Sequence, residues 1–144
     1  MGLNSATIII AAFSGWSDAA DSASDALDFL LDAWDGDEVA TLPADDFYDY
    51  SFNRPEAVLG SEGNREIEWP GAAVYRATKH PFGATEVYLV HGVEPNFRWR
   101  TFCDQLMAAI PRGQGAVLVT LGAMLADVPH TRPIPVQGTT SDSA

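Results

Sequence analysis

Short apolar runs recur along this chain, separated by stretches in which apolar residues return every three or four positions. The runs at residues 7–13 and 86–90 are continuous and apolar, which is typical of strands buried on both faces of a sheet. Six runs are predicted as strands: residues 7–13, 37–42, 65–69, 72–78, 86–90 and 116–121. The dipeptide Pro70-Gly71 predicts a turn that joins the third and fourth of them.

The first helical pattern follows the first strand. Ser17 or Asp18 is a suitable N-terminal cap, and the pattern continues to about Trp34. Its apolar stripe consists of Ala19, Ala23, Ala26, Leu27, Leu30, Leu31 and Trp34. This stripe is expected to pack on the sheet, since it covers one side of the helix.

The opposite side of that helix carries only acids. They recur at spacings of three and four residues: Asp18, Asp21, Asp25, Asp28, Asp32 and Asp35. At 3.6 residues per turn they share an arc of about 100°. Two interpretations stay open, a solvated face that favours solubility and a docking face for a basic partner. The partner-face candidates are Asp21, Asp25, Asp28 and Asp32.

A second helix is predicted to begin at Pro95 or Asn96 and to run to about Ile110, where Pro111 and Gly113 stop it. Its expected buried stripe is Trp99, Phe102, Cys103, Leu106, Met107 and Ile110. Because Cys103 belongs to this stripe, it is interpreted as a buried core thiol and not as a nucleophile.

Strands that alternate with helices predict an α/β fold with a mostly parallel sheet, and the turn at residues 70–71 makes that sheet mixed. The strands at residues 7–13 and 37–42 flank the first helix, so they are expected to be parallel in a right-handed crossover. The 144 residues fit a single domain, assigned to residues 1–138, with a polar tail at residues 139–144.

Charge is distributed unevenly. The net charge is −12, and residues 1–53 contain eleven acids and no Lys or Arg. Such a surface repels nucleic-acid backbones and anionic membranes, so neither is expected as a partner. The first residues have no basic segment and too short an apolar run for a signal peptide or membrane span, so a cytoplasmic location is expected.

Polar residues and glycines follow three of the predicted strands. In open α/β sheets, ligands bind beyond the carboxyl ends of the strands. The ligand-binding candidates at these ends are Gly15, Trp16, Gly92, Glu94, His130, Thr131 and Arg132. The last three lie in the proline-stiffened segment 121–138. If the three ends converge, Asp18, Glu94, His130 and Arg132 supply acid, base and cation groups for an enzyme.

Common catalytic and metal motifs are missing from the sequence. It contains no phosphate-binding glycine loop, no nucleophile elbow and no HExxH pair, and its three histidines lack metal-ligand spacing. Neither a metal nor a cofactor is therefore expected.

Four segments resemble the proteasome assembly chaperone family in its actinobacterial branch. They are GWSDAADSASDAL at residues 15–27, DDFYDYSFNRP at 45–55, GVEPNFRWRTF at 92–102 and LGAMLADVPHTRPIPVQG at 121–138. The resemblance implies a three-layer αβα sandwich similar to nucleoside phosphorylases and hydrolases, and a protein that assembles with itself or with a partner. Members of this branch are longer, so the chain resembles their N-terminal part.

Two functions follow from these observations. The first is a non-enzymatic binding or assembly protein that contacts its partner, or a second copy of itself, through the acidic helix face or the loop at residues 47–52. The second is a hydrolase or phosphorylase for nucleoside-like molecules in the strand-end crevice. That alternative rests on analogy of fold.

Overall fold

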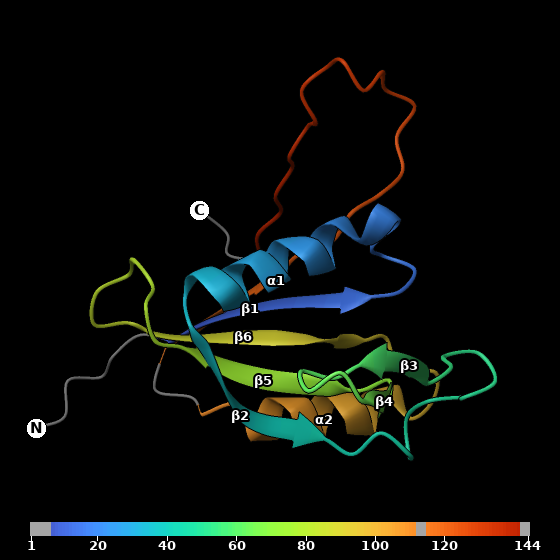
Figure 1. Ribbon diagram of the computed structural model, residues 1–144. Helices are drawn as coiled ribbons and strands as arrows, with labels where there is room; N and C mark the ends of the chain where they lie inside the picture. Colours follow the sequence, from blue (N-terminus) through green and yellow to red (C-terminus); the bar gives the residue numbers. More distant parts are fainter. Residues whose placement is uncertain (1–6, 112–114, 142–144) are drawn as a thin grey trace, which may run out of the picture.

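The computed structural model describes residues 7–111 and 115–141, and it has three layers (Figure 1). A five-stranded sheet forms the middle layer; helix α1 (Ser22–Ala33) covers one face and helix α2 (Trp99–Ala109) the other. The strands of this sheet are β1 (Thr7–Ser14), β2 (Gly36–Leu42), β5 (Ala72–Ala77), β6 (Glu86–Val93) and β7 (Ala116–Thr120). The predicted αβα sandwich is confirmed.

The order of the strands is β2-β5-β6-β1-β7. Strand β1 pairs in parallel with both β6 and β7, whereas β5 runs antiparallel to its neighbours β2 and β6. The sheet is therefore mixed, as predicted, and four of its five strands run in one direction while β5 runs against them. Strand β2 runs in the direction of β1, but β5 and β6 separate the two, so the crossover through α1 spans two other strands.

The two central strands send alternate side chains to the two helices. On β1, Ile9 and Ala11 belong to the core under α2, while Ile10 and Ala12 belong to the core under α1. Strand β6 alternates in the same way, and all of its residues from Val87 to Val90 are buried. Burial on both faces explains why these strands are continuous apolar runs.

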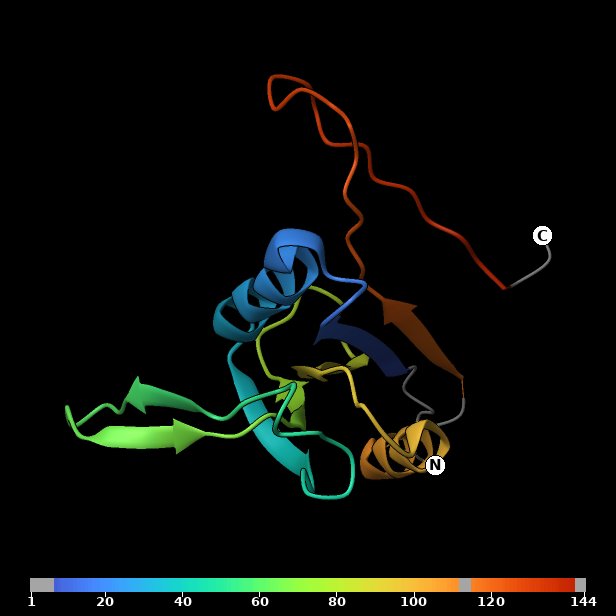
Figure 2. The same ribbon diagram turned by 90° about the vertical axis from the view of Figure 1, so that its right-hand side faces the viewer.

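A separate hairpin corrects the prediction of a turn at Pro70-Gly71. Strand β4 (Arg65–Glu68) pairs with β3 (Glu56–Leu59), a strand that the sequence did not indicate, and the hairpin projects from the sheet (Figure 2). Residues 70 and 71 only connect β4 to β5. The Val93 N–H donates to the Gly71 carbonyl at 2.9 Å, so the start of β5 is bound to β6 instead.

Both helices begin later than predicted. A turn of 3-10 helix, η1 (Ala19–Asp21), precedes α1, because Ala20 and Asp21 have a positive φ of 54°. Before α2, the N–H groups of Asn96 and Phe97 both donate to the carbonyl of Phe47, at 2.8 and 3.0 Å. These bonds tie the two residues to the preceding loop, so α2 begins only at Trp99.

Beyond β7 the chain leaves the sheet. Residues 124–138 form an exposed excursion that projects past the N-terminal end of α1 (Figures 1 and 2). Gly113, which was predicted to stop the second helix, and residues 142–144 of the predicted tail lie outside the described residues. None of the helices in the described ranges has the length and apolarity needed to cross a membrane.

Candidate functional site

The structure brings the three predicted strand ends to one edge of the sheet. The turn after β1 runs along the residues that follow β7, where the Ala19 N–H donates to the Ala123 carbonyl and the Ala123 N–H donates to the Ser17 carbonyl. The end of β6 joins them because the Glu94 N–H donates to the Ser14 carbonyl at 2.9 Å. Gly15, Glu94 and Gly122 thus lie at one crevice.

Glu94 is bound by the loop that follows β1. Its carboxylate accepts hydrogen bonds from the backbone N–H of Trp16 at 3.2 Å and from the backbone N–H of Ser17 at 3.4 Å. The Ser17 hydroxyl donates a third bond, at 2.6 Å. Successive N–H groups of this kind form a small anion-binding nest. In this protein the nest holds the protein's own carboxylate.

Gly15 allows this contact. Its φ of 152° lies in the range that favours glycine, and a Cβ at this position would lie 2.7 Å from the Glu94 Cδ. Gly92 is also closely packed, since a Cβ there would meet the Gly71 carbonyl oxygen and Ala72 Cβ at 2.6 Å. Both candidate glycines therefore serve close backbone approach.

We expect Gly15→Ala to lower the free energy of unfolding by about 1–2 kcal/mol, because it strains the backbone and pushes Glu94 off its donors. Gly63→Ala is the matched control, since Gly63 also has a positive φ, 77°, but nothing lies within 4 Å of the added Cβ. Urea denaturation of both variants measures the difference. An equal loss in the two variants would mean that the Glu94 contact adds no stability.

Asp18 points away from the crevice and caps helix α1. Only 5% of the residue is exposed, and its carboxylate accepts hydrogen bonds from the Ala23 N–H at 2.6 Å, from the Ser24 N–H and from the Ser24 hydroxyl at 2.5 Å. The role predicted from sequence, a helix cap, is therefore correct, although the carboxylate reaches forward over the turn at residues 19–21.

These contacts also set the acidity of Asp18. Burial alone raises the pKa of this carboxyl group, but the hydrogen bonds from the Ser24 hydroxyl and from the Ala23 and Ser24 N–H groups outweigh burial. The nearby imidazole of His91 acts in the same direction. The pKa of Asp18 therefore lies below its ordinary value of 3.8, and the group stays ionised as a helix cap.

The structure does not place His130, Thr131 and Arg132 beside Glu94. All three are exposed on the excursion at residues 124–138, which leaves the sheet after Ala123 (Figure 2). Trp16, at the outer rim of the crevice, is 93% exposed. The groups actually collected at the strand ends are thus the Glu94 carboxylate, the Ser17 hydroxyl and the backbone of three glycine-containing turns.

An apolar groove of about 360 Å³ opens directly beside these groups. It lies between α2 and the strands β1 and β7, with Ser17, Glu94 and Gly122 at its polar end. Besides Thr120, the rest of its wall is apolar: Ala11, Phe13, Pro95, Trp99, Phe102, Cys103, Leu106 and Leu121. The groove could not be predicted from the sequence, because its walls come from four separate segments.

The groove corrects the prediction that Cys103 is a core thiol. Phe102, Leu106 and Ile110 of the predicted stripe are buried on the sheet, but Cys103 is exposed and Trp99 is 51% exposed. The predicted stripe is wider than the part of α2 that packs on the sheet. Its residues Trp99 and Cys103 therefore line the groove.

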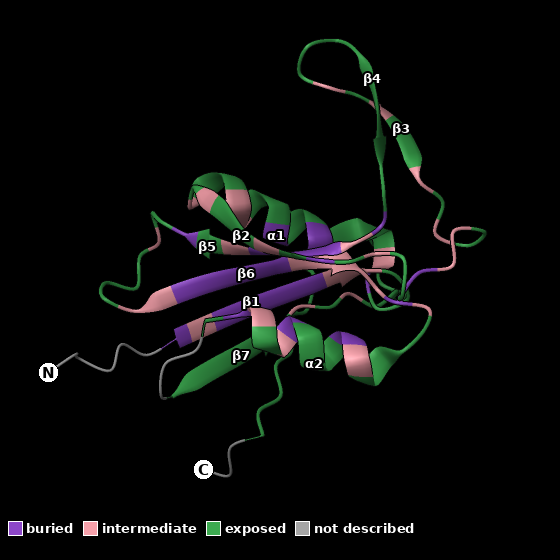
Figure 3. Cartoon of the chain, turned by 90° about the horizontal axis from the view of Figure 1, so that it is seen from below, coloured by how far each residue is buried: buried purple, intermediate pink, exposed green. Residues whose placement is uncertain are grey.

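Strand β7 is exposed along its whole length (Figure 3). In the parallel register, Leu118 pairs with Ile9 and faces the α2 layer, while Val117 and Val119 pair with Ile8 and Ile10 and face the α1 layer. Each of the three is at least 40% exposed. An edge strand with apolar side chains on both faces is a ready site for another polypeptide.

The two partner surfaces predicted from sequence have different outcomes in the structure. Asp21, Asp25, Asp28 and Asp32 are exposed on α1, and Asp28 lies beside the sheet, 3.4 Å from the His91 imidazole of β6. In the loop at residues 47–52, however, Phe47 is fully buried. That residue belongs to the core under α2, so this part of the loop is not a free contact surface.

Across residues 7–111 and 115–141, no group of three or more His, Cys, Asp or Glu side chains is arranged to hold a metal ion. The chemistry available at the strand ends is hydrogen bonding through the nest and apolar contact in the groove.

Comparisons with known proteins agree with this fold. The PAC2 family model matches residues 12–144. The crystal structure of a PAC2 family protein from Streptomyces avermitilis is 41% identical, with a TM-score of 0.80 over 94% of this chain and 57% of that one. A proteasome-assembly chaperone homologue from Mycobacterium tuberculosis is 42% identical, with a TM-score of 0.76 over 89% of this chain and 54% of that one.

A third structure, a protein of unknown function from Mycobacterium tuberculosis, is 27% identical, with a TM-score of 0.72 over 88% of this chain and 42% of that chain. The chain therefore spans little more than half the length of the first two of these relatives. No curated protein matches it.

Proposed function

Because the chain belongs to the PAC2 family, we propose that it is a non-enzymatic binding protein of the assembly-chaperone type. The observation that carries the proposal is the apolar groove between α2 and β7, which reaches Thr120 at the end of the exposed strand β7. Contiguous apolar surface of this kind is typical of sites that bind other polypeptides.

The partner that we propose is a proteasome subunit, on the strength of the chaperone homologue from Mycobacterium tuberculosis. Trp99 and Leu118 would supply the apolar anchors, and the free edge of β7 would supply backbone hydrogen bonds. Aromatic anchors in desolvated pockets contribute much of the binding energy in protein interfaces. A location in the cytoplasm, where such subunits assemble, is part of the same proposal.

The acidic face of α1 is the second candidate surface. Its carboxylates at Asp21, Asp25 and Asp32 extend into solvent, and no basic residue occurs within α1. Charges of one sign on an exposed helix raise association rates with a basic partner more than they raise affinity. We therefore assign this face a steering role and the groove the larger share of the affinity.

Catalysis on nucleoside-like molecules has less support. The two acids that it would use, Asp18 and Glu94, already accept several hydrogen bonds each from the protein itself. A general base needs a free lone pair directed at its substrate. The other two residues expected to take part in catalysis, His130 and Arg132, lie on the excursion after β7, beyond this crevice.

Binding to purified proteasome α- and β-subunits, measured by co-elution and by titration calorimetry, tests the proposal. We expect Trp99→Glu to weaken binding by about tenfold or more, since it places a charge in the apolar groove. Leu59→Glu is the matched control, because Leu59 is an exposed apolar residue of the separate hairpin. That variant should bind like the unmodified protein.

The variant Asp25→Lys distinguishes the contribution of the acidic α1 face to binding from that of the groove. If it slows association but leaves the affinity within about threefold, the steering role of α1 is supported. If Asp25→Lys abolishes binding while Trp99→Glu does not, the groove is not the contact surface. The proposed function itself fails if the unmodified protein binds neither type of subunit at concentrations of about 100 μM.

A further inference from the structure

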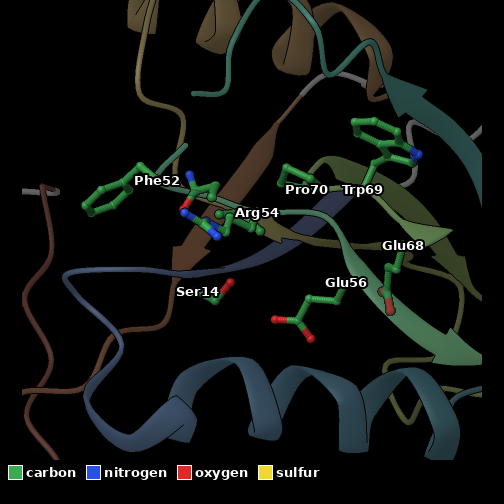
Figure 4. Close-up of a pocket in the computed structure, with 9 residues that line it drawn as sticks. Ser14, Phe52, Arg54, Glu56, Glu68, Trp69 and Pro70 are labelled. Atoms are coloured by element: carbon green, nitrogen blue, oxygen red, sulfur yellow. The ribbon is translucent and has the colours of Figure 1, made fainter. Parts of the chain in front are cut away.

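We propose that a second cavity, on the hairpin side of the sheet, binds a free amino acid with an apolar or aromatic side chain. The cavity has a volume of about 380 Å³ and lies where the hairpin meets the carboxyl ends of β1 and β6. Its lining consists of Ser14, Phe52, Asn53, Arg54, Glu56, Glu68, Trp69, Pro70 and Val93 (Figure 4). The volume lies within the range of small-molecule sites.

Two carboxylates that repel each other line the cavity. Glu56 and Glu68 are direct partners in the antiparallel ladder of β3 and β4. Directly opposed residues project to the same face, and like charges in such a pair are destabilising. Both side chains reach the cavity, so a cationic group bound there would relieve the repulsion between them.

Arg54 supplies the opposite charge in the same space. No Asp or Glu oxygen in the described ranges lies within 4.0 Å of its guanidinium, although the protein has 20 acids and only 8 Lys and Arg residues. Figure 4 shows Ser14, Arg54 and Glu56 around one open space. A guanidinium in this position suits a carboxylate, which it binds through two parallel N–H groups.

The segment that carries Arg54 is held in place by hydrogen bonds. The Asn53 amide and the Asp49 N–H both donate to the Asn96 side-chain carbonyl, at 2.9 and 2.8 Å. The Asn53 N–H also donates to the Asp49 carbonyl at 2.7 Å. Arg54 therefore extends from a fixed turn, which lowers the entropy cost of binding.

Aromatic rings form two of the cavity walls. Trp69 packs edge-on against Tyr50, with ring centroids 5.1 Å apart, and Phe52 stands on the other side in Figure 4. Both rings are more than half exposed. They can cover an apolar side chain of a ligand. An ammonium near Glu56 and Glu68, a carboxylate on Arg54 and an apolar side chain against one of the rings together describe an α-amino acid.

The test uses the full chain and two probes, L-phenylalanine and L-leucine. Titration is followed by calorimetry and by the NMR chemical shift of the Trp69 indole N–H. We expect at least one probe to bind with a dissociation constant of about 1 mM or lower and to shift that signal. Its amide, which lacks the carboxylate, and its N-acetyl derivative, which lacks the ammonium, should bind at least about tenfold more weakly.

Paired variants identify the contacts. Arg54→Met and Glu68→Gln should each weaken binding by about tenfold or more, whereas Arg65→Met and Glu62→Gln, on exposed hairpin positions outside the cavity, should not. Absence of binding by both probes, equal binding of the amide, or equal affinity of the Arg54→Met variant would overturn the proposal. Binding of inorganic phosphate alone would also overturn it. These outcomes leave the groove on the α2 side untouched.

Discussion

Replacing Phe47 by alanine is expected to lower the free energy of unfolding by about 3–5 kcal/mol, the usual range for a buried phenylalanine. Phe47 is fully buried, and its ring packs edge-on against Phe102 of α2 at a centroid distance of 5.3 Å. The truncation leaves a cavity between the loop and the helix, and the surrounding core fills it only partly. Chemical denaturation followed by circular dichroism measures the loss.

Phe52→Ala is the matched control for Phe47→Ala, because Phe52 belongs to the same loop and is largely exposed. We expect its effect to stay within about 0.5 kcal/mol. The backbone bonds from Asn96 and Phe97 to the Phe47 carbonyl remain possible in both variants. Similar losses in the two variants would contradict the assignment of Phe47 to the core.

The case of Phe47 also shows where sequence patterns are uninformative. The segment ADDFYDYSFNRP has no helical or strand period, and its acids indicate a surface loop. Phe47 and Tyr48 are nevertheless buried, since the loop folds back under α2 and the Tyr48 hydroxyl donates to the Val93 carbonyl at 2.9 Å. Burial of this kind depends on contacts some 45 residues apart, which no local pattern encodes.

The elements themselves were easier to predict than their pairing. The apolar runs located the central strands β1 and β6 and the α/β class, because a strand buried on both faces has a distinctive composition. Strand order was not predictable, since it depends on which edges meet in space. Residues 65–69 were assigned to the main sheet, but β4 pairs with β3 because β5 already has partners on both sides.

The candidate site was predicted in part for the same reason. Parallel strands end at one edge, so Gly15, Glu94 and Gly122 could be expected to meet. The prolines at 129, 133 and 135 fix the local path of the following segment, but they do not determine the direction in which it leaves the sheet. The cap role of Asp18 was predictable from the sequence, but its Ser24 donor and the bond from Ser17 to Glu94 were not, because these contacts depend on the fold.

The role of Asp18 leads to a prediction about pH. At neutral pH, Asp18→Asn should lower the free energy of unfolding by roughly 2–3 kcal/mol, because an ionised carboxylate accepts bonds from Ala23, Ser24 and the Ser24 hydroxyl. The pKa of this group is lower in the folded protein than its ordinary value of 3.8. Ionisation therefore stabilises the fold, and this contribution is complete at pH values well above 3.8.

As the pH falls through the lowered pKa of the folded state, Asp18 becomes protonated in the folded protein as well, and its contribution is lost. The difference in unfolding free energy between the unmodified protein and Asp18→Asn should therefore shrink below pH 3.8. Asp25→Asn, an exposed acid on the same helix, is the control and should change stability by no more than about 0.5 kcal/mol. Urea denaturation at several pH values measures both differences. A gap for Asp18→Asn that stays constant down to pH values of about 2 would show that the carboxylate does not stabilise the helix through its charge.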